Sequence, residues 1–238
     1  MYPDDCIQSV IATPQEWWVD TNDHALCRGA LIYAFVPHVD QTPYTFEPVG
    51  RIEPTRHDSA VVRVAPLKVG QPLKKMDLPV AAMPLREGEV WVASRAKVRP
   101  CLVLGSTDNP KVAKALVRGM PNTSTAPTIL VAPYYGVDKD GTRAGYNPEF
   151  VERVKHCEYP QFVWDQLPIK GPSESILRLD QLQPIGAHYH SHKLSEFKLS
   201  ADALAVMDEL IQWLVFGGVP EGGHVAVYRE LIEETLAK

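Results

Sequence analysis

Prolines limit the length of every regular element in this chain. The 238 residues include 21 prolines, and these cluster at 72–84 and 160–172. Because proline interrupts both helices and central strands, many short elements are expected rather than long helices. We therefore predict a mainly β fold with a few helices, of the α+β class.

Short apolar runs bounded by glycine, proline or polar residues indicate where the strands lie. The predicted strands are 30–36, 60–64, 89–93, 101–104, 128–132 and 176–182. A helix is predicted after Ser200, because apolar residues recur at helical spacing until Gly217. The last segment, 224–236, begins like a strand and ends with helix-forming residues.

A break in regular patterning divides the chain. Glycines and prolines interrupt 69–84, which predicts a linker and a boundary near residue 86. We expect a β-rich N-terminal domain of unknown role over 1–85, a second domain over 86–216 and a C-terminal extension over 217–238.

Composition excludes several classes of protein. The net charge of −5 argues against a protein that coats nucleic acid non-specifically, and no DNA partner is expected. The four cysteines form no C-x-x-C pair, which fits reduced thiols. The N-terminus lacks the pattern of a signal peptide, and no run approaches the roughly 20 apolar residues of a membrane span. We expect a cytoplasmic protein with no membrane partner.

The segment 175–182 places a cation and a carboxylate two residues apart. On a strand, residues i and i+2 share a face, so Leu177 and Leu179 are expected to point into the core. Arg178 and Asp180 would then point outward together. This pair is a candidate for handling phosphate, and the alternative is a surface ion pair.

Three motifs in order resemble one protein family. The chain reads R-E-G-E-V-W-V over 86–92, then K-V-R-P-C-L-V-L over 97–104, then R-L-D-Q over 178–181 before an amphipathic helix. This order resembles the MazF/PemK (Kid) family of toxin endoribonucleases. The resemblance implies an SH3-like β-barrel with a C-terminal helix, a homodimer and an antitoxin protein partner. It also implies cleavage of single-stranded RNA without metal or cofactor, by attack of the ribose 2′-hydroxyl on the adjacent phosphate.

The resemblance also implies roles for three catalytic residues. Such chemistry needs a base for the hydroxyl and cations for the phosphorane. By position, Asp180 would be the base, Arg178 the cation or proton donor, and Arg99 a phosphate contact. The pKa of a guanidinium is above about 12, so the group keeps its proton at ordinary pH. Charge stabilisation is therefore the role expected for Arg178.

Further side chains are expected to bind the RNA. Cationic and aromatic side chains suit phosphates and splayed bases. The candidates are Arg95, Lys97, Tyr134, Tyr135 and Gln181. An alternative for the two tyrosines is that they cap the rim of the barrel. Lys111, Lys114 and Arg118 share one face of a possible helix, which is either a solvated face or an RNA-binding patch.

Two departures from the family pattern favour a non-catalytic alternative. The third strand ends in Pro133-Tyr134-Tyr135, where the family commonly carries a threonine at the active site. The first loop is also short, at about 94–98. A binding module that has kept the barrel and lost the chemistry is the second hypothesis.

Alternating histidines support a third hypothesis. His188, His190 and His192 share one face of an extended segment, and Glu196 follows. Imidazoles with a nearby carboxylate can bind zinc, iron or nickel. A metal-dependent hydrolase that uses His190 and His192 is therefore possible, against exposed loop histidines that bind nothing.

Overall fold

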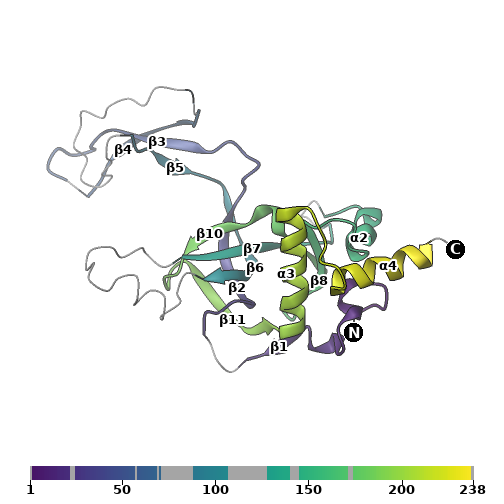
Figure 1. The fold of residues 1–238 in the computed structure, drawn as a ribbon. Coiled ribbons are helices and arrows are strands. Elements are labelled where there is room, and N and C mark those ends of the chain that lie inside the picture. The colour runs from purple at the N-terminus through teal and green to yellow at the C-terminus, as the bar shows by residue number, and fades with distance from the viewer. Residues whose placement is uncertain are drawn as a thin grey trace, which may run out of the picture. The chain divides into compact units, whose positions relative to one another are not determined.

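The computed structural model describes residues 2–21, 25–56, 58–68, 70, 88–106, 128–139, 145–170 and 174–236. These residues form mainly antiparallel sheets with helices, so the predicted α+β class is confirmed (Figure 1). The chain divides into a larger unit, residues 1–35 and 98–238, and a smaller unit, residues 36–97. This division differs from the predicted boundary near residue 86, because the first 35 residues pack with the C-terminal part of the chain.

One sheet organises the larger unit. Its strand order is β1-β11-β2-β6-β7-β9-β8, and β10 also pairs with β7. The strand pairs of the described residues do not close this sheet into a barrel. The strands are β1 (Trp18–Asp20), β2 (Ala30–Pro37), β6 (Ala96–Ser106), β7 (Thr128–Gly136), β8 (Phe162–Gln166), β9 (Glu174–Arg178), β10 (Gln183–Gly186) and β11 (His192–Leu199).

The neighbour of the R-P-C-L-V-L strand is not the strand that directly precedes it in the sequence. That strand, β6, lies beside β2 rather than beside the strand predicted at 89–93. Residues 101–103 are fully buried, and a strand buried on both faces needs a largely buried neighbour. β2 meets this need because most of its residues are buried. In contrast, β5 (Trp91–Ala93) is largely exposed and belongs to the smaller unit.

The smaller unit contains a three-stranded antiparallel sheet. Its strands are β3 (Tyr44–Gly50), β4 (Val61–Pro66) and β5, in the order β4-β3-β5. The predicted strand at 60–64 corresponds to β4. Within the sequence, this unit is inserted between β2 and β6.

A long helix packs on one face of the larger sheet. The predicted helix is confirmed as α3 (Ala201–Phe216), which begins where the Ser200 hydroxyl accepts from the Ala203 N–H. It ends at Gly217, whose φ of 79° is left-handed. Its buried face packs with Leu31 and Leu177 of the sheet, and Figure 1 shows α3 lying across the strands.

The remaining helices among the described residues are α2 (Pro148–Lys155), α4 (His224–Leu236) and three 3₁₀ turns, η1 (Ile7–Val10), η2 (Pro14–Glu16) and η3 (Leu179–Gln181). The prediction of a strand-like start to the last segment is wrong, because α4 is helical from His224 onward. Glu209 of α3 explains this start, since its carboxylate accepts from the His224 and Val225 N–H groups. None of the described helices is long and apolar enough to cross a membrane.

A buried carboxylate joins the N-terminal segment to the sheet. Asp165 of β8 is almost fully buried and accepts hydrogen bonds from Tyr2, Trp17, Trp18 and Tyr134. Burial raises its pKa from 3.8 to about 6, and the four hydrogen bonds oppose that rise. Three of the four donors, Tyr2, Trp17 and Trp18, thus tie the N-terminal segment to β8.

Candidate functional site

The Arg178/Asp180 pair forms at the end of β9. The strand stops at Arg178 and η3 begins at Leu179, so the predicted continuous strand over 176–182 is wrong. Leu177 and Leu179 are nonetheless both buried, as expected. Arg178 Nε donates to Asp180 Oδ1 at 2.7 Å, and Nη2 donates to Oδ2 at 2.6 Å. The guanidinium therefore holds the carboxylate in a two-point contact.

Tyr135 lies at the centre of the predicted catalytic residues. The Arg99 guanidinium lies 3.8 Å from the centroid of its ring, and the Arg178 guanidinium lies 5.6 Å from that centroid. The Tyr135 hydroxyl donates to Gln181 Oε1. We call Arg99, Tyr135, Arg178, Asp180 and Gln181 the Tyr135 cluster. Three neighbouring strands, β6, β7 and β9, bring these residues together.

The electrostatics of the Tyr135 cluster favour an anion. The bond to Asp180, assisted by Tyr146, raises the pKa of Arg178 against the opposing effect of burial, so this guanidinium keeps its proton. Arg99 Nε is buried and has no hydrogen-bond partner among the described residues. A buried N–H group without a partner costs free energy, which an anionic oxygen would recover. The cluster thus carries two cations, one carboxylate and one donor that is still to be paired.

Three other predicted RNA-binding residues are not among the five of the Tyr135 cluster. Tyr134 is 2% exposed and its hydroxyl donates to Asp165 at 2.9 Å, so its ring is not free to stack on a base. This outcome follows from strand geometry, because Tyr134 and Tyr135 point to opposite faces of β7. Arg95 and Lys97 are exposed and belong to the smaller unit. The basic residues Lys111, Lys114 and Arg118 lie outside the described residues.

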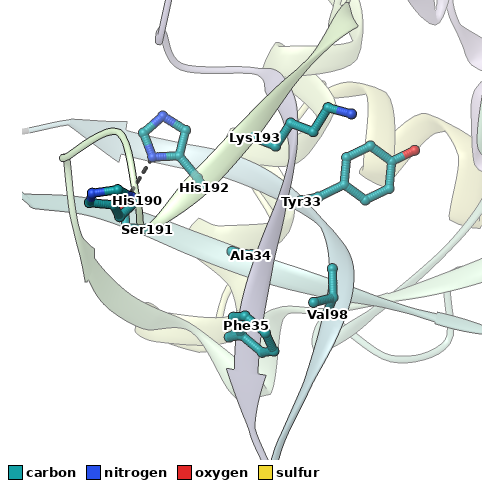
Figure 2. Close-up of a pocket in the computed structure, with 8 residues that line it drawn as sticks. All are labelled: Tyr33, Ala34, Phe35, Val98, His190, Ser191, His192 and Lys193. Atoms are coloured by element: carbon teal, nitrogen blue, oxygen red, sulfur yellow. Dashed lines mark hydrogen bonds between the residues drawn. The ribbon is translucent and has the colours of Figure 1, made fainter.

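The histidines line a groove at the start of β11. Figure 2 shows His190, His192 and Lys193 beside Tyr33 and Phe35 of β2. The groove has a volume of about 410 Å³ and is open to solvent. The Ser191 hydroxyl lies 2.9 Å from His192 Nδ1. Burial, and then the proximity of His188, lowers the pKa of His192.

These histidines do not assemble a metal site. Across the described residues, the group whose ligand atoms lie within 4.8 Å of one another is Asp5, Glu152 and His156. His188, His190, His192 and Glu196 form no such group there, so the geometry does not support the metal hypothesis. Asp5 and Glu152 are exposed, and Lys155 already pairs with Glu152 at 2.7 Å. We assign no metal to that group.

Sequence reasoning missed the aromatic side chains that surround Arg178. Its guanidinium lies 5.0 Å from the centroid of the Phe162 ring. Phe162 in turn contacts Phe150 and Tyr159, at centroid distances of 5.3 and 5.9 Å. The available signal was the density of aromatic residues between 146 and 162, a segment that has no place in a minimal barrel.

Comparison with known proteins does not identify this chain. No protein-family model matches it, and no curated protein matches its sequence. Its function must therefore be argued from the site itself.

Proposed function

We propose that the larger unit binds single-stranded RNA at the Tyr135 cluster and cleaves it, as a divergent relative of the MazF/PemK toxins built on an SH3-like sheet. The observation that carries this proposal is the convergence of Arg99, Arg178 and Asp180 around one half-exposed ring. Residues up to 81 positions apart in the sequence meet there, and they are the three for which the resemblance implies catalytic roles.

The arrangement of strands supports the resemblance only in part, because the 86–92 motif that helps to carry it ends in β5, which pairs with β3 in the smaller unit. With β2 beside β6, the R-P-C-L-V-L strand has a first-strand partner that is long and buried. The first loop is then not shortened, because the smaller unit is inserted at that point in the sequence. One of the two departures from the family pattern is thereby removed. The missing threonine is still a departure, and Tyr135 occupies that end of β7.

The chemistry divides among the three residues. A carboxylate oxygen of Asp180 takes the proton from the ribose 2′-hydroxyl, since each oxygen keeps a lone pair besides the one that Arg178 uses. The 2′-oxygen bonds to the phosphorus and the bond to the 5′-oxygen breaks. Arg178 and Arg99 stabilise the negative charge on the phosphorane oxygens, and solvent supplies the proton for the leaving 5′-oxygen. The products carry a 2′,3′-cyclic phosphate and a 5′-hydroxyl.

The test is cleavage of a long single-stranded RNA by the full chain in EDTA. Fragments with cyclic phosphate ends are expected, and Asp180→Asn should reduce their rate of formation by about 10²- to 10⁴-fold. Asp58→Asn is the matched control, because Asp58 also pairs with an arginine two residues before it, Arg56. Cleavage that persists in Asp180→Asn would exclude the assignment of the base.

The same experiment decides the non-catalytic alternative. Asp180 is held at both oxygens by Arg178, which is also the geometry of a purely structural pair. Intact RNA that is retained by the protein in a gel shift, and released by Arg178→Ala, would establish a binding module without catalysis. RNA that is neither cleaved nor bound would exclude both.

A further inference from the structure

The aromatic contacts of Arg178 continue away from the Tyr135 cluster. Beyond Phe162, the Tyr159 ring follows at a centroid distance of 5.9 Å. The Arg153 guanidinium then lies 4.9 Å from the centroid of Tyr159. Guanidinium groups and rings thus form one continuous series of contacts, in which two adjacent rings, Phe162 and Tyr159, lie between the guanidiniums of Arg178 and Arg153. We call Arg178, Phe162, Tyr159 and Arg153 the arginine–aromatic track.

Different parts of the fold hold the track in place. Phe162 begins β8 and pairs with Arg178 of β9 in the antiparallel register. Tyr159 follows α2, and Arg153 lies in the last turn of that helix. The Phe150 ring contacts both Tyr159 and Phe162, at centroid distances of 5.7 and 5.3 Å. The rings of Tyr159 and Phe162 are partly buried and pack against the hydrophobic core formed with α2, so part of each side chain stays exposed.

The chemistry of the track matches one kind of ligand. A single strand of RNA alternates flat bases with anionic phosphates, and aromatic rings and guanidiniums bind these two parts respectively. We infer that the track binds the nucleotides on one side of the cleaved phosphate, so that the RNA runs from the Tyr135 cluster over Phe162 and Tyr159 toward Arg153. This inference rests on the proposed function, because it extends the same RNA beyond the site of cleavage.

One contact in the track limits its affinity. Arg153 Nε donates to Glu158 Oε2 at 2.7 Å, and the Arg153 side chain is 55% exposed. A phosphate would have to compete with this carboxylate for the guanidinium. Removal of the Glu158 charge should therefore strengthen RNA binding, whereas removal of the Arg153 charge should weaken it. A merely structural ion pair predicts no such opposite effects.

The experiment measures the affinity of the full chain for single-stranded 2′-O-methyl oligouridylates of increasing length, which cannot be cleaved. Three variants perturb the track: Arg153→Gln, Glu158→Gln and Tyr159→Leu, the last of which keeps apolar packing while it removes the ring. Arg229→Gln is the matched control. Its guanidinium also stacks on an aromatic ring, 4.7 Å from the centroid of Trp213, and lies near a carboxylate, 3.9 Å from Glu233.

We expect the variants to separate by oligonucleotide length. Arg153→Gln and Tyr159→Leu should leave the affinity for the shortest bound oligonucleotide unchanged and weaken the longer ones by about fivefold or more. Arg153→Gln should also reduce the salt dependence of log K by about 0.7, the value for one phosphate contact on a single strand. Glu158→Gln should strengthen the binding of the longer ones, and Arg229→Gln should change nothing.

The outcomes that contradict the track differ from those that contradict the site. If the wild-type chain binds no oligonucleotide, the proposed function fails and the track fails with it. If Arg178→Ala abolishes binding but Arg153→Gln and Tyr159→Leu act equally on all lengths, or not at all, the Tyr135 cluster stands and the track is excluded.

Discussion

The two units each contain an arginine and an aspartate two residues apart, in very different settings. Arg178 of the larger unit contacts Asp180 at 2.7 and 2.6 Å, and the two side chains are 21% and 34% exposed. Arg56 of the smaller unit contacts Asp58 at 3.4 and 3.3 Å, and these side chains are 58% and 72% exposed. The same spacing thus gives a close, half-buried pair in one unit and a loose, solvated pair in the other.

The difference lies in the neighbours rather than in the pairs. Arg178 lies over the rings of Tyr135 and Phe162, and Arg99 shares the first of these rings. In the described part of the smaller unit, no ring lies under Arg56. Partial burial strengthens every charge interaction at Asp180, whereas solvent screens those at Asp58. Arg178/Asp180 is therefore the candidate site of the two, because the sheet supplies a second cation and a ring beside it.

The largest difference between the pairs is expected in RNA cleavage. Arg178→Ala should lower the rate by about 10²- to 10³-fold, because it removes a charge aimed at the phosphorane. Arg56→Ala should leave the rate unchanged, and both rates are measured on the same RNA in EDTA. Arg178→Lys should fall between, since lysine keeps the charge but cannot make the two-point contact. Equal losses in Arg178→Ala and Arg56→Ala would show that the comparison has no functional meaning.

The next effect concerns a third carboxylate, Asp165. Unlike Asp180 and Asp58, it is almost fully buried. Its pKa is raised in the folded chain from 3.8 to about 6. The folded state therefore binds the proton more tightly, so the stability from this group is present below about pH 4 and is lost as the pH rises through about 6. The loss amounts to about 3 kcal/mol.

The measurement is urea unfolding of the wild type and Asp165→Asn across that pH range. Because asparagine does not titrate, the variant should gain about 3 kcal/mol relative to the wild type as the pH rises from below 4 to above 6. Tyr134→Phe removes a hydrogen bond that lowers the pKa, so the loss of stability should be larger and extend to higher pH than in the wild type. A constant difference between Asp165→Asn and wild type at all pH values would contradict this account.

Local signals predicted the elements whose formation depends on local interactions. The Ser200 cap, the helical spacing after it and Gly217 predicted α3 because all three act within a few residues of its ends. The strand prediction at 176–182 was wrong from Leu179 onward, because it rested on a local pattern that does not distinguish a strand from a turn at this point. Alternation of apolar side chains continues into η3, where Leu179 is still buried, so the pattern alone does not reveal the turn.

The sequence pattern did not predict which strands pair across long distances in the chain. The 86–92 motif resembles a family first strand, yet β2, about 60 residues earlier, takes the place beside β6. Nothing local distinguishes the two strands except that β2 carries the longer apolar run. Asp165 was missed in the same way, because its four donors come from residues 2 to 134. The five residues of the Tyr135 cluster were among the eight predicted catalytic and RNA-binding residues, but the prediction also included Arg95, Lys97 and Tyr134, and it missed the aromatic surroundings of Arg178.

A smaller effect is expected from the ring of Tyr135, which lies beside Arg178 and has no counterpart beside Arg56 in the described residues. Tyr135→Leu should weaken the binding of single-stranded 2′-O-methyl RNA by about tenfold, because it removes a stacking surface and the support of Arg99. Tyr135→Phe keeps the ring and loses the hydroxyl that donates to Gln181, so a change of about twofold is expected. Tyr44→Leu is the control, since Tyr44 is an exposed tyrosine of the smaller unit. Equal effects of Tyr135→Leu and Tyr44→Leu would mean that the ring has no special role.

The smallest difference is expected in stability. Each pair has a hydrogen-bonded backbone amide nearby. The Leu179 N–H donates to the Gln161 carbonyl at 2.9 Å, and the Arg56 N–H donates to the Glu53 carbonyl at 3.1 Å. Asp180→Asn should speed hydrogen exchange at Leu179 by a factor that corresponds to at most about 1 kcal/mol, and Asp58→Asn should change exchange at Arg56 by less than about 0.5 kcal/mol.

This ordering is what separates a functional pair from a structural one. A pair retained for stability should cost more in unfolding than in cleavage when it is broken. For the Tyr135 cluster we expect the reverse. Breaking the pair should lower the cleavage rate by about 10²-fold or more, and local stability by at most about 1 kcal/mol, which is a factor of about five in an equilibrium constant. Two results together would contradict this. Asp180→Asn would lower the free energy of opening at Leu179 by several kcal/mol, and RNA cleavage would fall only in proportion to the fraction of unfolded protein. Arg178/Asp180 would then be a structural pair like Arg56/Asp58 that differs from it in burial.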